Sequence, residues 1–394
     1  MECVNGYKFV QLLGSGSFGQ VYKAEKDGLD WAVKKFNPSS LLCCDVAAHC
    51  AEIDVCLHLS SPHLVKGREY FQHNSQYYLV MELAECSLDK YMGPLKADVL
   101  IPQLLLCLQA LQENNLSHGD IKATNFLIKQ DKVLLTDFGM CRSQDVTTRN
   151  TFQSWTFDSP QNMVYNHCIS RVEITKHHDI FMEDPDGFDS VGDVWALGVT
   201  IVYLLTGKLL FYTPDSQNTQ GYFALMQEYI SNPQAYLTKT GVDKIWFPLL
   251  LRVLCPSYKN RVKRISDLTK IKMVPDESFY IKSEPVTDHI FTFMLEWGKG
   301  IFSYFSLSED TIREMKRFYQ HCYRMKLMWQ EKNNNDHMML FYSCLTIINA
   351  MHQNKLICSG DVTRAIGNVF DEFEFVTYQN RLFDELQGRV FIKD

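Results

Sequence analysis

The sequence lacks C-x-x-C cysteine pairs, a secretory leader and any apolar run long enough to cross a membrane. It has 13 cysteines in 394 residues but no C-x-x-C motif, which argues against a zinc ribbon or a thioredoxin-like site. The longest apolar run, 194–205, is well short of the roughly 20 residues that a membrane helix needs. We therefore expect an intracellular protein, cytoplasmic or nuclear, with reduced cysteines and no membrane association.

An excess of positive charge is also absent. The 39 Lys and Arg residues are outnumbered by 46 Asp and Glu residues, giving a net charge of −7. Dedicated nucleic-acid binders usually carry a basic excess, so no nucleic-acid partner is expected. The hydrophobic fraction of 46% excludes a disordered chain, and the length allows one large domain or two smaller ones.

Hydrophobic periodicity divides the chain into a strand-rich beginning and a helical remainder. Residues 7–36 alternate around a glycine cluster and predict three strands, and residues 44–59 predict a helix that ends before Pro62. Residues 68–83 predict another strand pair, and helices are expected from about Pro94 onward. Strands first and helices later predict an α+β protein with two lobes.

Two further segments interrupt this order. Residues 162–190 are polar and indicate an insertion or a long loop, whereas residues 281–394 predict a helical extension. Within it, Ser306 and Glu309 fit a capping box. An apolar stripe that should be buried follows at Ile312, Met315, Tyr319, Cys322 and Met325. The extension could pack on the helical second lobe (the C-lobe), dimerise or bind a partner, and the sequence leaves these alternatives open.

A glycine motif lies between the first two predicted strands. Gly14, Gly16 and Gly19 match G-x-G-x-x-G and are followed by Val21. Glycines let a backbone approach phosphates closely, but a Rossmann turn has the same spacing. In a Rossmann unit a helix follows the glycines, whereas residues 20–25 predict a strand, which favours a loop that covers phosphates between two strands.

Lys34 lies in the third predicted strand among apolar residues. Most lysines are surface residues, and a phosphate-anchoring lysine would need a carboxylate to hold it. Glu52, in the predicted helix, is the natural candidate, and Asp54 is a less favoured one.

The segment from His118 to Asn125 has the most specific chemistry in the chain. Phosphoryl transfer needs a carboxylate to accept a hydroxyl proton, a cation near the transferred group and an oxygen ligand for Mg²⁺. Asp120, Lys122 and Asn125 supply these three groups on one short loop. A predicted hairpin then leads to Asp137 in an Asp-Phe-Gly triplet, and this carboxylate would bind Mg²⁺.

Taken in this order, the motifs resemble those of eukaryotic-type protein kinases, from about Tyr7 to about Lys272. The resemblance implies a two-lobed protein-kinase fold over residues 7–280, with a small β-rich N-lobe over about 7–84 and a larger helical C-lobe over about 85–280. The helical extension 281–394 would follow it.

The resemblance also implies the site residues and the cofactors, ATP and Mg²⁺. Asp120 and Lys122 would be catalytic, Asn125 and Asp137 would hold Mg²⁺, and His118, Ser154 and Asp193 would give structural support. The residues that would bind ATP are Leu13, Gly14, Ser15, Gly16, Ser17, Phe18, Gly19, Gln20, Val21, Ala32, Lys34, Glu52, Met81 (as gatekeeper), Glu82, Leu83 and Leu127.

Lys122 and Ser154 resemble the Ser/Thr branch of the family, which implies protein substrates with Ser or Thr hydroxyls. The main alternative is a pseudokinase that serves as an interaction module, for which the insertion and the extension would suit a docking role; the extension could also bind a partner or self-associate. The complete catalytic set counts against it. A small-molecule kinase fits the His-Gly-Asp triplet but not Lys122 or the Asp-Val-Trp-Ala-Leu-Gly segment that begins at Asp193.

Two positions depart from the family pattern. Gly119 replaces the Arg that pairs with a phosphorylated activation loop, so we expect activity without phosphorylation of Thr147, Thr148 or Thr151. Gln161 replaces a Glu that normally pairs with a late Arg, for which Arg264 and Arg261 are the candidates. The H-G-D-I-K form of residues 118–122 resembles vaccinia-related and poxvirus kinases, and the divergence suggests a viral source acting in a host cell.

Overall fold

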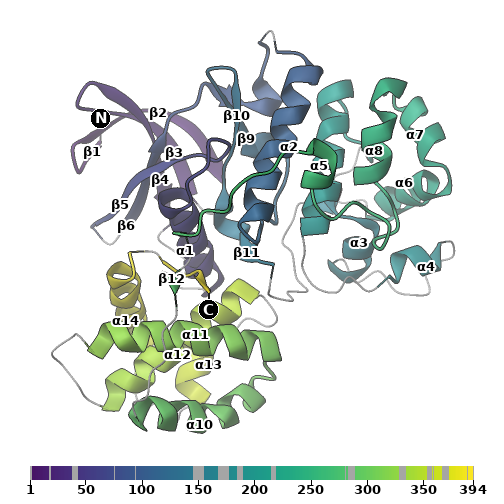
Figure 1. Ribbon diagram of the computed structural model, residues 1–394. Coiled ribbons are helices and arrows are strands. Elements are labelled where there is room, and N and C mark those ends of the chain that lie inside the picture. Colours follow the sequence, from purple (N-terminus) through teal and green to yellow (C-terminus); the bar gives the residue numbers. More distant parts are fainter. Residues whose placement is uncertain are drawn as a thin grey trace. The chain divides into compact units, whose positions relative to one another are not determined.

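The computed structural model follows the predicted order of strands and helices (Figure 1). It describes residues 2–16, 19–37, 43–74, 76–93, 95–144, 155–166, 177–183, 190–213, 219–279, 281–282, 289–327, 334–352, 357, 359–365, 372–387 and 389–393. The chain forms two compact units: Met1–Ser60, Lys66–Leu83 and Asp276–Asp394 make the first, and Ser61–Val65 with Ala84–Pro275 make the second.

The first unit contains an antiparallel sheet with strand order β1-β2-β3-β4-β6-β5. Alternating apolar residues form these strands. Their inward side chains make a core that includes Tyr7, Phe9, Val33 and Tyr78. The elements are β1 (Cys3–Val4), β2 (Tyr7–Gly16), β3 (Gly19–Lys26), β4 (Leu29–Phe36), α1 (Cys43–His58), β5 (Gly67–His73) and β6 (Gln76–Glu82).

The C-terminal extension belongs to this same unit, together with the sheet and α1. Helix α12 packs along α1, and the short strands β12 and β13 pair in parallel. The elements are β12 (Ile281–Lys282), α10 (His289–Tyr304), α11 (Glu309–Leu327), α12 (Asn334–His352), α13 (Ser359–Ala365), α14 (Glu372–Glu385) and β13 (Ile392–Lys393).

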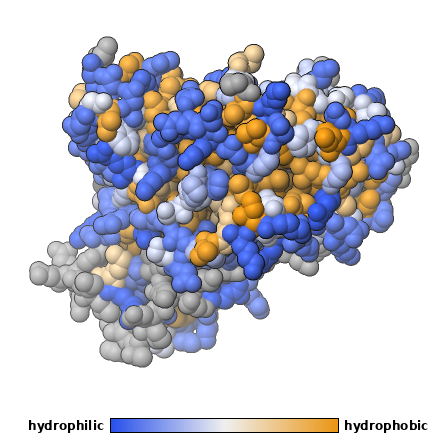
Figure 2. Space-filling view, turned by 45° about the horizontal axis from the view of Figure 1, so that its top comes forward, coloured by the Kyte–Doolittle hydropathy of each residue, from blue (hydrophilic) through white to orange (hydrophobic). Residues whose placement is uncertain are grey.

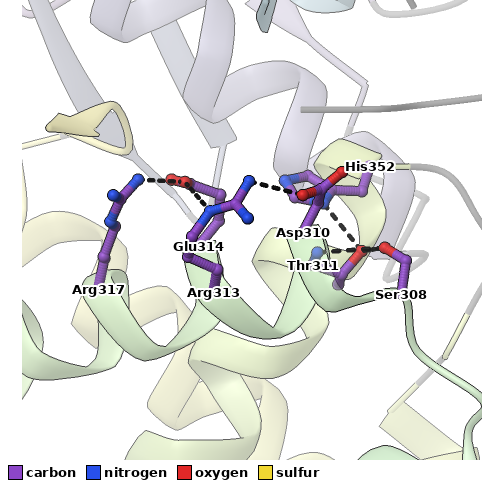
Figure 3. A network of polar contacts seen from close by, with 7 residues as sticks. All are labelled: Ser308, Asp310, Thr311, Arg313, Glu314, Arg317 and His352. Carbon is purple, nitrogen blue, oxygen red and sulfur yellow. Dashed lines mark hydrogen bonds and ion pairs between the residues drawn. The ribbon is translucent and has the colours of Figure 1, made fainter. Parts of the chain in front are cut away.

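Helix α11 begins at a different cap from the one that the sequence predicted. Ser308, rather than Ser306, accepts a hydrogen bond from Thr311 N (3.2 Å). Ser306 has a left-handed backbone (φ 53°) and turns the chain after α10, so the predicted capping box is wrong. Thr311 Oγ1 also lies 2.9 Å from His352 Nδ1, and two ion pairs, Asp310–Arg313 and Glu314–Arg317, line the same helix (Figure 3).

The apolar stripe of α11 is buried at its centre. Met315, Tyr319 and Cys322 are fully buried, whereas Ile312 and Met325 at its ends are partly exposed. This pattern is the expected one for an amphipathic helix that contributes one face to a core.

The second unit is mainly helical. Its short strands flank the loops that contain the predicted catalytic residues. These strands are β7 (Cys86–Ser87), β8 (Leu116–Ser117), β9 (Phe126–Lys129), β10 (Lys132–Leu135) and β11 (Arg142–Ser143). Its helices are α2 (Ala97–Glu113), α3 (Pro160–Asn166), α4 (His178–Phe181), α5 (Ser190–Thr206), α6 (Thr219–Ser231), α7 (Pro233–Lys239), α8 (Phe247–Val253) and α9 (Ser266–Thr269). Helices α3 and α4 lie in the segment 162–190, so its described parts do not form one continuous loop.

None of the described helices combines the length and hydropathy needed to span a membrane. Hydrophilic residues are interspersed with smaller hydrophobic patches on the face drawn in Figure 2. The thiols of Cys50, Cys56, Cys107 and Cys141 are buried, consistent with the predicted packing role of cysteine.

Candidate active site

The first unit contributes an ion pair between a strand lysine and a helix glutamate. Lys34 on β4 places Nζ at 2.6 Å from both carboxylate oxygens of Glu52 on α1, and both side chains are buried. Sequence reasoning had preferred Glu52 over Asp54 as the partner of Lys34, and the structure brings Lys34 and Glu52 together. A buried ammonium held in this way is fixed in position for a phosphate.

Two further side chains surround Lys34. His49, one turn before Glu52, packs on Phe36 with ring centroids 4.3 Å apart, and Lys34 Nζ lies 5.6 Å from the same phenyl ring. Burial and the nearby charge of Lys34 lower the pKa of His49 to about 3. His49 is therefore neutral at physiological pH and adds no charge beside the ion pair.

The glycine motif forms the turn between β2 and β3. Gly14 pairs with Val21, Ser15 with Gln20 and Gly16 with Gly19. Gly19 leaves no room for a side chain, because a Cβ there would lie 2.3 Å from Lys35 O. Leu13 is exposed on β2. Ser17 and Phe18, which we predicted to bind ATP, lie outside the described residues.

Met81 and Glu82, which we predicted to bind ATP, are the last two residues of β6. Met81 is buried and pairs with Ala32 on β4, so both lie on adjacent strands of the same sheet. Glu82 exchanges hydrogen bonds with the backbone of Lys66, donating from its N (3.0 Å) and accepting on Oε1 (2.8 Å). Leu83 ends this part of the first unit.

The second unit holds the predicted catalytic loop. Lys122 Nζ donates to Asp120 Oδ2 at 2.6 Å, and Asn125 Nδ2 lies 3.2 Å from the same oxygen. Asn125 Nδ2 also donates to Asp120 O at 2.8 Å, which closes the loop on itself. Of the three side chains that we predicted to act together, Lys122 and Asn125 therefore converge on the carboxylate of Asp120.

Asp193 on α5 fixes the backbone that precedes Asp120. Its two carboxylate oxygens accept hydrogen bonds from His118 N (2.6 Å) and Gly119 N (2.9 Å). All three residues are buried, so a charged acceptor here holds the loop firmly. Gly119 has φ 80°, and a Cβ there would lie 2.8 Å from Met140 O. The backbone conformation and the lack of space both favour glycine at this position. The same glycine also means that the loop lacks the Arg side chain of the family pattern.

His118 connects the catalytic loop to the Asp-Phe-Gly segment. Its Nδ1 accepts from Asp120 N (3.1 Å), so the ring proton belongs on Nε2, which lies 2.9 Å from Thr136 O. Its ring also meets Phe138 edge-on at 5.7 Å. His118 therefore positions Asp120 and the segment that carries Asp137 through one imidazole ring.

Asn125 and Asp137, which we predicted to hold Mg²⁺, both carry oxygen donors. Thr136 N donates to Asn125 O at 2.9 Å, which joins the two loops immediately beside these residues. Asp137 adopts a left-handed backbone (φ 64°), a conformation that Asp tolerates better than most residues. A carboxylate with an amide oxygen is the hard donor set that this cation prefers. Leu127 follows on β9, and Ser154 lies outside the described residues.

Arg261, not Arg264, is the partner of Gln161. Arg261 Nη2 donates to Gln161 Oε1 at 3.1 Å, and its guanidinium lies 4.8 Å from the ring of Trp195 on α5. Gln161 Nε2 in turn donates to Ile180 O and Pro256 O, both at 2.9 Å. Gln161 thus uses both ends of its amide.

Sequence reasoning missed a second set of contacts, between Asp54 on α1 and the last residues of the extension. Val390 N donates to Asp54 Oδ2 at 2.7 Å. Asp54 was considered only as a partner for Lys34, and nothing in the local sequence pairs it with a segment 336 residues away.

Several known proteins match part of the chain. The chain is 26% identical over 242 residues to the serine/threonine-protein kinase TIO of Arabidopsis thaliana, covering 59% of this chain and 17% of that protein. It is 27% identical over 226 residues to cell division control protein 7 of Schizosaccharomyces pombe (55% and 19%). With RAC-beta serine/threonine-protein kinase B of Xenopus laevis the identity is 26% over 227 residues (54% and 43%).

The chain spans less than half of the length of each of these three relatives. The model of the protein kinase domain family matches residues 7–266, which include both parts of the candidate site. The order of the motifs, the two-lobed fold and this match agree: the chain belongs to the protein kinase domain family.

Proposed function

We propose that the protein is an ATP-dependent kinase that phosphorylates serine or threonine hydroxyls of protein substrates. The observation that carries the proposal is the convergence of Lys122 Nζ and Asn125 Nδ2 on one oxygen of Asp120, at 2.6 and 3.2 Å. A carboxylate, a cation and an amide in this arrangement match the needs of phosphoryl transfer.

In the proposed reaction, the substrate hydroxyl oxygen bonds to the γ-phosphorus while the bond from that phosphorus to the β-phosphate oxygen breaks. Asp120 orients the hydroxyl and accepts its proton, and ADP leaves. Lys122 neutralises charge on the oxygens of the transferred group. Asp193 and His118 hold the loop, so that little reorganisation is needed during the reaction.

ATP would be held mainly by groups of the first unit. Lys34, fixed by Glu52, would pair with the α- and β-phosphates, and the glycine turn would cover them. The adenine would lie at the edge formed by Met81 and Leu83. Asn125 and Asp137 would hold Mg²⁺, which when bound neutralises phosphate charge.

Three further features support the finer assignment. Lys122, two residues after Asp120, is typical of the Ser/Thr branch, and two of the three relatives reported above are named serine/threonine-protein kinases. The H-G-D-I-K motif at His118–Lys122 favours a place near the vaccinia-related and poxvirus kinases. We further propose action in the cytoplasm or nucleus of the cell, on protein substrates.

The proposal is tested by transfer of ³²P from γ-labelled Mg-ATP to a peptide array, using the full chain. Asp120→Asn should lower the rate at least about a hundredfold, because the proton acceptor is lost. Asp131→Asn is the matched control: Asp131 is exposed on the β9–β10 turn, and Asn tolerates its left-handed backbone (φ 61°).

Phosphoamino-acid analysis then separates the alternatives. Label on Ser and Thr, lost in Asp120→Asn and kept in Asp131→Asn, supports the proposal. Equal labelling by wild type and Asp120→Asn would refute intrinsic activity and favour a pseudokinase. Transfer to nucleosides or aminoglycosides but not to peptides would indicate a small-molecule kinase.

A further inference from the structure

Helix α1 carries two buried carboxylates that meet different parts of the first unit. Glu52 contacts Lys34 on the sheet, at 2.6 Å from both oxygens. Asp54 is fully buried and contacts the C-terminal segment. Residues two apart on an α-helix point about 200° apart, so α1 has one carboxylate toward the sheet and one toward the extension.

Asp54 accepts hydrogen bonds from the backbone of that segment. Its Oδ2 accepts from Val390 N (2.7 Å) and Phe391 N (3.0 Å), and its Oδ1 lies 3.1 Å from Arg389 Nε. Oδ1 also lies 2.9 Å from His58 Nδ1, one turn along α1. A guanidinium and two consecutive amides thus surround a single carboxylate, which makes the contact both charged and geometrically specific.

The C-terminal segment is itself anchored within the first unit. Phe391 packs on Phe279 with ring centroids 5.5 Å apart, and Arg389 donates to Phe279 O. The strand β13 that follows pairs with β12, which lies shortly after Phe279. Asp276, shortly before Phe279, contacts the residues that follow α1: its Oδ2 accepts a hydrogen bond from Ser60 N at 3.0 Å.

These contacts make the position of α1 depend on the extension. A buried carboxylate without polar partners is strongly unfavourable, so Asp54 depends on the two amides and the guanidinium of Arg389–Phe391 in addition to His58. A helix that is fixed at Asp54 is also fixed at Glu52, less than one turn away.

We propose that Asp54 is a positioning residue of the kinase: through it, the segment Arg389–Phe391 holds α1 where Glu52 pairs with Lys34. This inference rests on the proposed function. The extension would then do part of the work that a phosphorylated activation loop does in kinases with Arg at the position of Gly119, since Gly119 offers no guanidinium to bind a phosphate.

The first experiment compares kcat of the full chain with that of two variants, one on each side of the contact. We expect Asp54→Asn to lower kcat at least tenfold, because the amide nitrogen of Asn would face the donors of the segment. Arg389→Gln should lower kcat in the same direction by a smaller factor. The matched control is Arg364→Gln, which removes an exposed ion pair with Asp361 (2.6 Å) in the same extension, and its kcat should equal that of wild type.

A double variant separates positioning from general destabilisation. If Asp54 acts through Glu52, then Glu52→Gln/Asp54→Asn should have a kcat within twofold of Glu52→Gln alone. Rates are corrected for the folded fraction measured by circular dichroism at the assay temperature. Losses that multiply in the double variant, or a folded Asp54→Asn with wild-type kcat, would overturn the proposal.

Hydrogen exchange gives a readout that does not depend on activity. Asp54→Asn should speed amide exchange in α1 at least tenfold while leaving α5 unchanged, and Arg364→Gln should change neither. Unchanged exchange in α1 would overturn the positioning role even if the enzyme is active. If α1 loosens but wild type shows no Asp120-dependent transfer, the proposed function fails and the contact between Asp54 and the extension stands.

Discussion

Arg261 donates to Gln161 Oε1 at 3.1 Å, while the other end of the Gln161 amide donates to two backbone carbonyls. The family pattern has Glu at this position. A Glu in place of Gln161 would gain a charged partner in Arg261. It would also lose both donor contacts and place negative charge against Ile180 O and Pro256 O. The neutral amide is therefore adapted to its surroundings rather than a weakened Glu.

We therefore expect Gln161→Glu to lower the free energy of unfolding by about 1–3 kcal/mol, since Ile180 O loses its donor from Gln161 and Pro256 O keeps only the one from Arg261 Nη2 (3.1 Å). Chemical denaturation of the full chain measures this change. Gln234→Glu, at an exposed position of α7, introduces the same charge without these contacts and serves as the control. A more stable Gln161→Glu would show that the ion pair outweighs the lost hydrogen bonds.

Gly119→Ala should destabilise the protein more than Gly28→Ala. Both glycines have a left-handed backbone (φ 80° and 74°), so each substitution carries a similar strain of about 1–2 kcal/mol. At Gly28 nothing lies within 4 Å of the added Cβ, whereas at Gly119 it would lie 2.8 Å from Met140 O. Urea unfolding of the two variants compares them, and equal losses would mean that the loop around Gly119 adjusts freely.

Asp193→Asn should weaken the catalytic loop. Asn keeps one oxygen for the amides of His118 and Gly119 and turns an NH₂ group toward the other. We expect a loss of about 2–4 kcal/mol in the free energy of unfolding, as charged hydrogen bonds contribute about 1.5–3 kcal/mol each, and a lower kcat. Denaturation and ³²P transfer are measured together, with Asp131→Asn as the reference. Unchanged stability would contradict the bracing role of Asp193.

His49 should make folding sensitive to acid. Its pKa is lowered to about 3 in the folded protein, while an unfolded His titrates near 6.5, so the unfolded state binds more protons between these values. Stability is then fully present above pH 6.5 and declines as the pH falls toward 3. From pH 7 to 5.5 the contribution of His49 is about 1 kcal/mol.

Comparing wild type with His49→Phe isolates this group, because the other titrating residues are common to both. Phe preserves the stacking on Phe36 and removes the proton site. As the pH is lowered, the free energy of unfolding of the variant should decrease less steeply than that of wild type. Identical pH profiles would contradict the lowered pKa of His49.

The strands, α1 and the catalytic loop were predictable because their signals are local. Alternation set the strands of residues 7–36, and the chemistry of Asp120, Lys122 and Asn125 lies within six residues of sequence. The cap of α11 was predicted wrongly, since the left-handed backbone of Ser306 depends on how α10 ends. Arg261 could be identified as the partner of Gln161, in preference to Arg264, only from its contacts in the fold with Gln161 and with the ring of Trp195.

The place of the extension could not be predicted for a different reason. An amphipathic stripe shows that Met315 and Tyr319 are buried, but it does not identify what covers them. The contact between Asp54 and Val390 joins residues 336 positions apart. Single-residue patterns carry no information about such pairs.

The first unit is discontinuous in sequence, and this affects how the protein is made. Residues 84–275 are synthesised between α1 and the extension that contacts it. At bacterial to eukaryotic translation rates of about 5–20 residues per second, the 336 residues from Asp54 to Val390 take on the order of 20–70 s. For most of that interval the nascent chain contains Lys34, Glu52 and the whole catalytic loop. The residues that donate hydrogen bonds to Asp54 have not yet been synthesised.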